Sequence, residues 1–114
     1  MIYIASPYSS PIKSEREDRA YQVGAFAAHC VKRGHVVYCP IAAWHHLAVE
    51  HKLPGDACFW ERLNRRILRH CFEMWVLKLD GYDDSEGVNA EIIFAKALGI
   101  TLRYFDGDNF AEVI

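Results

Sequence analysis

The feature that most constrains the fold is the regular alternation of short β-branched or aromatic runs with segments of helical length. Runs such as "IYIA" and "MWVLKL" are each followed by a stretch with apolar residues at three- and four-residue spacing. Strands are expected at 2–5, 35–40, 74–79 and 100–105, and helices at about 14–33, 57–71 and from the "DDSEG" segment to Gly99. The alternation predicts an α/β fold with a doubly wound, mainly parallel sheet of four or five strands, Rossmann-like or flavodoxin-like.

Length and composition predict one ordinary globular domain over residues 1–114, because a chain of this size buries roughly two-thirds of its unfolded surface around one core. The formal net charge is −2, whereas proteins that bind nucleic acid polymers or anionic membranes are normally basic, so neither partner is favoured. No run of 18 apolar residues and no basic leader is present. The cysteines form no CxxC pair and read as reduced thiols of a cytoplasmic protein; they are Cys30, Cys39, Cys58 and Cys71.

Three loops are predicted to meet at one edge of the sheet. In doubly wound sheets, ligands bind outside the carboxyl ends of the strands. The loops that follow the first three strands there are "SPYSSP" at 6–11, a long second loop at 39–56, and "DGYDDSEG" at 80–87. The binding site is therefore expected to be built from these loops.

An ionisable residue, Glu91, lies in the apolar stripe of the last helix. Val88, Ile92, Ala95 and Leu98 form this stripe at helical spacing, and Glu91 falls within it rather than on the exposed side. Burial would raise the pKa of the Glu91 carboxyl and make it a candidate nucleophile or base at the floor of a pocket. A buried glutamate is also found paired in a purely structural role, so the pattern leaves both interpretations open.

The third loop concentrates polar residues at the start of that helix. The amides of a helix N-terminus and a serine hydroxyl form a ready anion site, and a glycine allows close approach of a ligand to the backbone. The alternative is a simple capping box formed by Asp83 and Glu86. The residues concerned are Asp80, Asp83, Asp84, Ser85, Glu86 and Gly87.

Three motifs resemble one known family. "IYIASPYSS", "RGHVVYCP" and "DSEGVNAE", which ends at Glu91, are similar to motifs of the nucleoside 2-deoxyribosyltransferase superfamily. That superfamily includes the deoxynucleoside 5'-monophosphate N-glycosidases and several small uncharacterised branches, and the resemblance covers nearly the whole chain. It implies a hydrolase or transferase that acts on the N-glycosidic bond of a 2'-deoxynucleoside or its 5'-monophosphate. It implies no metal or organic cofactor, and it implies a homodimer or larger homo-oligomer.

The resemblance also implies roles for individual residues. Glu91 corresponds to the nucleophile that forms a covalent deoxyribosyl-enzyme, as in retaining glycosidases. Asp84, or Asp80, would help to protonate the leaving base, and Tyr8 would be a further catalytic residue. Ser85 matches the serine that holds a 5'-phosphate. The substrate-binding set is Tyr3, Ser6, Ser9, His45, Asn64, Asp80, Ser85 and Gly87.

One departure from the family pattern and one histidine-rich loop leave alternatives open. Family members often carry an aspartate where this chain has Asn64, and an amide cannot act as an acid. A catalytically silent nucleotide-binding module is therefore one alternative, and an N-glycosidase for ribosides or NAD is another. His45, His46 and His51 in the second loop lack the spacing of a zinc site and instead suggest a substrate lid, a phosphate-binding histidine or an ordinary loop.

Overall fold

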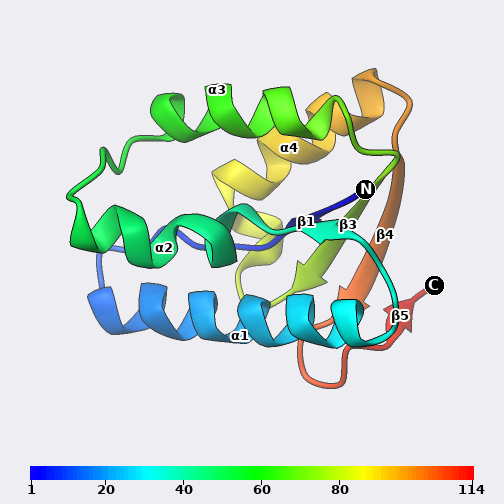
Figure 1. Ribbon diagram of the computed structural model, residues 1–114, viewed down its shortest axis with the longest axis horizontal. Coiled ribbons are helices and arrows are strands. Elements are labelled where there is room, and N and C mark those ends of the chain that lie inside the picture. Colours follow the sequence, from blue (N-terminus) through cyan, green and yellow to red (C-terminus); the bar gives the residue numbers. More distant parts are fainter.

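A five-stranded sheet forms the centre of the protein, seen in a computed structural model that describes residues 1–114 (Figure 1). The strands are β1 (Ile2–Ala5), β2 (Val37–Tyr38), β3 (Glu73–Lys78), β4 (Thr101–Asp106) and β5 (Glu112–Val113). Their spatial order is β2-β1-β3-β4-β5; the first four are parallel, and β5 is antiparallel to β4. This is the flavodoxin-type order, so the predicted α/β class and mainly parallel sheet are confirmed.

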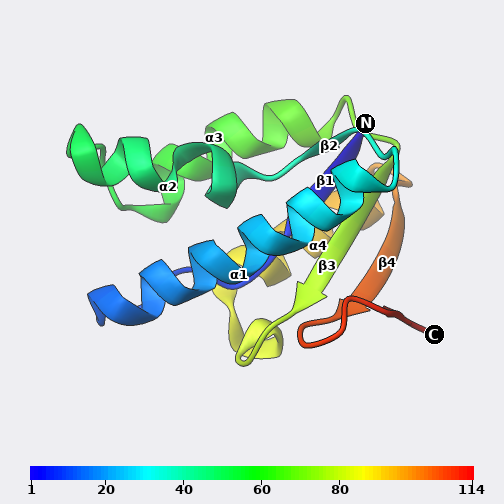
Figure 2. The same cartoon turned by 60° about the horizontal axis from the view of Figure 1, so that its bottom comes forward.

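Helices cover both faces of the sheet. They are α1 (Lys13–Lys32), α2 (Pro40–Glu50), α3 (Ala57–Leu68) and α4 (Glu86–Ala97), and a short 3₁₀ turn spans Tyr82–Asp84. Figure 1 shows α1 on one side of the strands and α3 with α4 on the other. In both views α2 lies beyond the carboxyl end of β1 (Figure 1, Figure 2). None of these helices has the length and apolar character needed to cross a membrane.

The alternation of side chains along β1 divides the core into two layers. Successive side chains of a strand point to opposite faces of the sheet. Ile2 and Ile4 pack with Phe26 on the α1 face, whereas Tyr3 and Ala5 pack on the face covered by α3 and α4. All four residues of β1 are buried, as expected for a central parallel strand covered on both sides.

The long second loop predicted at 39–56 is wrong, because most of it forms α2. Pro40 ends the apolar run of β2 but also occupies the first turn of α2, where its fixed φ and missing N–H are tolerated. The second strand is correspondingly shorter than predicted. Only Val37 and Tyr38 pair with β1, and Val36 remains exposed at the sheet edge.

The start of α4 also differs from the capping-box prediction. Ser85, not Asp83, is the N-cap: its hydroxyl oxygen accepts a hydrogen bond from the Val88 amide at 3.2 Å. Asp83 lies one turn earlier, in the 3₁₀ segment, so it is too far back to cap the helix. Leu98, expected in the buried stripe, follows the end of the helix and is exposed.

Candidate functional site

The Glu91 carboxylate meets the Tyr3 hydroxyl between α4 and β1. Glu91 lies in the second turn of α4, on the side that faces the sheet, and Tyr3 lies in β1 with its side chain on that face. The Tyr3 hydroxyl donates a hydrogen bond to Oε2 of Glu91. Tyr3 is fully buried, whereas Glu91 retains some solvent accessibility although protein surrounds it. A carboxylate held in this way is fixed at one oxygen and accessible from outside.

Burial dominates the electrostatics of this pair. Loss of hydration raises the pKa of the Glu91 carboxyl to about 7; the hydrogen bond from Tyr3 lowers it, and the negative charge of Glu61 on α3 raises it. Burial, followed by the charge of Glu91, raises the pKa of Tyr3 well above its usual value. Tyr3 therefore stays protonated and remains a hydrogen-bond donor to Glu91 over the physiological pH range.

The pair lies at the topological switch point of the sheet. In a sheet of order 2-1-3-4-5, the connections from β1 and β3 leave toward opposite faces, and the crevice between them is the usual ligand position. Here the first loop, residues 6–12, follows β1, and the third loop, residues 79–85, follows β3 and leads into α4. Ser6, the first residue after β1, has a buried Oγ without a hydrogen-bond partner. A polar ligand or water would satisfy that atom.

A row of aromatic side chains leads from Tyr3 toward α3. The rings of Tyr3 and Tyr38 are 6.3 Å apart, and the Tyr38 hydroxyl accepts a hydrogen bond from Trp44 Nε1 at 2.8 Å. Trp44 on α2 is in turn 6.1 Å from Trp60 on α3, measured between ring centroids. Beginning at Tyr3, the partner of Glu91, the row is made of aromatic rings, a kind of surface on which a planar ring can stack.

Asn64 presents a second unsatisfied polar atom. Its side chain lies on α3, one turn after Trp60, and its Oδ1 is buried with no hydrogen-bond partner. Unpaired buried acceptors are uncommon in folded proteins. Ser6 and Asn64 are thus the two side chains whose buried polar atoms call for a ligand or a water.

Tyr8 and His45 form a separate hydrogen-bonded pair. The Tyr8 hydroxyl is 2.7 Å from His45 Nδ1. Burial, reinforced by neighbouring His46, lowers the pKa of His45, so the ring is neutral near pH 7. The neutral ring has one N–H donor and one acceptor nitrogen, and the contact with Tyr8 occupies Nδ1 and leaves Nε2 free. His45 and His46 line two hollows of about 350 and 500 Å³ between α1 and α2, and Glu91 lines neither of them.

The other predicted site residues lie on exposed turns. Ser85 is half-buried, and its hydroxyl already serves as the α4 cap. Asp80 and Asp84 are exposed in the third loop; Ser9 is exposed in the first. No three histidine, cysteine, aspartate or glutamate side chains come together in a metal-binding arrangement. Asp80, Asp84 and Ser9 are thus exposed on the loops that follow β3 and β1, whereas Glu91 lies between α4 and the sheet.

Two residues near the Tyr3–Glu91 pair lie outside the predicted site: Glu61, whose charge acts on Glu91, and Tyr38, whose ring neighbours Tyr3. In the sequence, Glu61 and Arg65 at i,i+4 have the spacing of an ordinary exposed helix pair. Tyr38 falls within the strand predicted at 35–40. Its position directly before Cys39 and Pro40, at the carboxyl end of β2, was the available signal.

A family profile described as "Domain of unknown function (DUF1937)" matches residues 1–106. The chain belongs to this family. Among solved structures it resembles a 2-deoxyribosyltransferase from the psychrotolerant bacterium Bacillus psychrosaccharolyticus, with a TM-score of 0.59 and 22% identity over 99% of this chain and 75% of that chain. No curated protein sequence matches.

The similarity to the transferase extends over nearly all of this DUF1937 chain, so the two proteins share one fold. This similarity agrees with the fold that the resemblance of three sequence motifs to the nucleoside 2-deoxyribosyltransferase superfamily implied. The roles of individual residues remain predictions.

Replacing Tyr3 with phenylalanine is expected to raise the pKa of Glu91 above about 7, because it removes the hydrogen bond that stabilises the ionised carboxylate. Carboxyl carbon NMR over a pH series measures this shift directly. Tyr104→Phe is the matched control, since Tyr104 packs on the same face of the sheet and has no hydrogen bond to Glu91. An unchanged Glu91 titration in Tyr3→Phe would show that the contact is absent in solution.

Proposed function

We propose that this protein cleaves the N-glycosidic bond of a 2'-deoxynucleoside or its 5'-monophosphate, with Glu91 as nucleophile. The observation that carries the proposal is the Tyr3–Glu91 pair: a carboxylate fixed at Oε2, surrounded by protein and still accessible at the switch point of the sheet. The fold, which resembles that of a 2-deoxyribosyltransferase, supports the same chemistry by analogy.

The reaction takes two steps. In the first step, Oε1 of ionised Glu91, the oxygen that Tyr3 leaves free, attacks the anomeric carbon while the bond to the base nitrogen breaks. The leaving base takes a proton from an exposed acid of the third loop. Asp84 is our candidate for this acid, and Asp80 is the alternative. In the second, the ester between Glu91 and the sugar is broken. Attack by water, which loses its proton to a base, completes hydrolysis, and attack by a second nucleobase completes transfer.

The surroundings of Glu91 fit the two ends of such a substrate. The faces of Trp44 and Trp60 are available to stack on a nucleobase, whose edge would supply the missing partner of Asn64 Oδ1. Ser6 Oγ would meet a sugar hydroxyl. The amino end of α4, with Ser85 and Gly87, is placed to receive a 5'-phosphate; a Cβ on Gly87 would touch only Ser85 Oγ, at 4.0 Å, so the backbone there is open.

The hydrogen-bonded pair of Tyr8, from the catalytic set, and His45, from the substrate-binding set, is our candidate for the rim of the site. Because His45 is neutral and its Nδ1 is engaged by Tyr8, its Nε2 is an uncharged hydrogen-bonding group. Such a group suits a hydroxyl or carbonyl of the substrate. Ser9 stands in the same first loop as Tyr8.

Chromatographic detection of free base tests the proposal. The purified protein is incubated with a panel of deoxynucleosides, their 5'-monophosphates, ribosides and NAD, with and without a second base as acceptor. Release from deoxy substrates alone supports the proposal, and release from ribosides or NAD moves the activity to the riboside class. A nucleotide that raises the melting temperature without being consumed would instead identify a silent binding module.

The turnover rate is expected to rise as the pH increases through about 7. Only the ionised form of Glu91 attacks, and burial holds its pKa at about 7, so the ionised fraction grows across that range. The measurement is kcat/KM for the best substrate of the panel over a pH series from about 3.5 to 9. A rising limb near the ordinary glutamate value, below pH 5, would contradict this assignment.

A further inference from the structure

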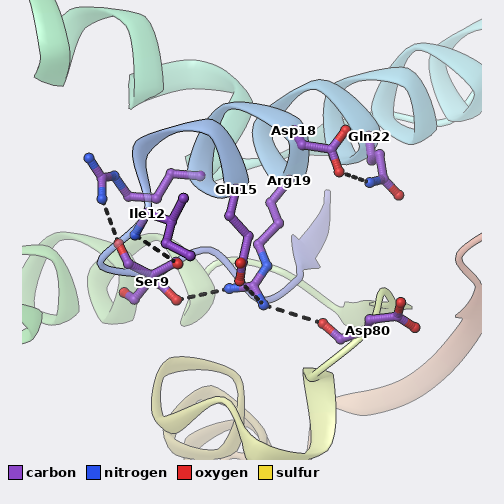
Figure 3. Close-up of polar contacts among 9 residues, drawn as sticks. Ser9, Ile12, Glu15, Asp18, Arg19, Gln22 and Asp80 are labelled. Carbon is purple, nitrogen blue, oxygen red and sulfur yellow. Dashed lines mark hydrogen bonds and ion pairs between the residues drawn. The ribbon is translucent and has the colours of Figure 1, made fainter.

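The side chain of Arg19, in the second turn of α1, bridges two loops that are far apart in sequence. Its Nη1 donates to the Ser9 carbonyl oxygen at 2.8 Å, and its Nη2 donates to the Asp80 carbonyl oxygen at 3.4 Å (Figure 3). Glu15 lies one turn before it on α1 and pairs with Nη2 at 3.1 Å. The Arg19 side chain is 17% exposed, so the guanidinium is largely enclosed by these partners.

The backbone of the third loop is shaped to admit this side chain. Gly81 has φ of +86°, a conformation that favours glycine, and a Cβ added there would lie 3.3 Å from Arg19 Nη2. The first loop is held in a similar way, because Arg16 Nη1 donates to the Ser10 carbonyl oxygen at 2.5 Å. Both loops are therefore fitted against the beginning of α1.

Arg19 makes the only hydrogen-bonded connection between the two loops. No hydrogen bond joins residues 6–12 to residues 79–85 directly, and no other side chain donates to both. The first loop begins with Ser6 and contains Tyr8; the third leads into Ser85 and the helix that carries Glu91. Beyond the ends of the paired strands β1 and β3, one guanidinium is thus the hydrogen-bonded link between the two halves of the candidate site.

We propose that Arg19 is a positioning residue that links the first loop to the third and so sets the width of the candidate site. We call this link the latch. This inference rests on the proposed function for its catalytic consequence. Arginine suits the task because its planar fork donates in two directions at once, whereas the single ammonium of lysine is a point charge. A loosened latch lets the free protein visit arrangements that cannot bind, which raises the apparent dissociation constant without changing the chemistry of the bound complex.

Arg19→Lys tests the latch, because it keeps the charge and the pairing with Glu15 but loses the fork. KM is expected to rise about tenfold, the effect of one charge-assisted hydrogen bond, while kcat stays within about twofold. A purely structural contribution would lower the folded fraction, and so kcat, without moving KM. Arg33→Lys is the matched control: Arg33 follows the other end of α1 and bonds only to His29.

Hydrogen exchange provides the readout that does not depend on activity. The amides of Tyr82, Asp84 and Ser85 bond within the third loop, so they report its opening. Their exchange is expected to accelerate about tenfold in Arg19→Lys and to stay unchanged in Arg33→Lys. Unchanged exchange in Arg19→Lys would overturn the latch, as would a fall in kcat at constant KM. Faster exchange in a protein that cleaves no substrate would sustain the latch and leave only the proposed function refuted.

Discussion

Glu91→Gln is expected to abolish base release, lowering kcat/KM by about 10³-fold or more, the scale on which removal of a catalytic nucleophile acts. Glutamine has the shape of glutamate and its amide oxygen still accepts the Tyr3 hydrogen bond, but that oxygen is neutral and does not displace a base from an anomeric carbon. The measurement is base release under the conditions that suit the parent protein.

Glu86→Gln is the matched control for this loss. Glu86 opens the same helix, is exposed and does not contact Tyr3, so the same chemical change there is expected to leave turnover intact. Circular dichroism of both variants establishes that each is folded. Turnover that survives in folded Glu91→Gln would remove Glu91 from the role of nucleophile.

The same substitution is expected to stabilise the protein at neutral and alkaline pH. The pKa of Glu91 rises on folding from 4.5 to about 7, so between these values the folded state holds more protons than the unfolded state and stability falls as pH rises. A shift of this size amounts to about 3 kcal/mol above pH 7, a cost that glutamine does not incur. The advantage of Glu91→Gln over the parent should therefore be larger by about 3 kcal/mol at pH 8 than at pH 4.5.

Urea unfolding at pH 4.5 and pH 8 measures this difference. Glu86→Gln serves again as control, because it makes the same chemical change at an exposed position of the same helix. Parallel stability curves for the parent and Glu91→Gln would mean that Glu91 is not buried as a carboxylate. A buried carboxylate that lowers the stability of the fold is typical of a residue that serves chemistry rather than folding. The unfolding measurement needs no substrate.

The strands were predictable because each is marked by its own run of apolar residues. The apolar runs of β1 and β3 are buried on both faces, so continuous hydrophobicity marked them without further information. The helix α2 was missed because Pro40 signals both the end of a strand and the first turn of a helix, and only the packing of α2 against α1 resolves the two.

The candidate site was predictable only in part. The position of Glu91 in an apolar stripe pointed to a buried carboxylate, but its partner Tyr3 lies 88 residues earlier in the chain, and no local pattern encodes that contact. The same holds for the row from Tyr38 through Trp44 to Trp60, which three separate elements bring together. Motif resemblance located Glu91 and Ser85, whereas Glu61 and Arg19 emerge only from the folded arrangement.

The central place of β1 governs the order in which the chain can fold during synthesis. β1, which is synthesised before both of its neighbours, pairs on one side with Val37 and Tyr38 and on the other with Glu73–Val76. Until β3 emerges, one edge of β1 stays open, and an open apolar edge is a template for aggregation. Contacts this distant in sequence also slow folding. Nascent chains that end before β3 are therefore expected to rely on chaperones. The sheet is expected to form late and cooperatively.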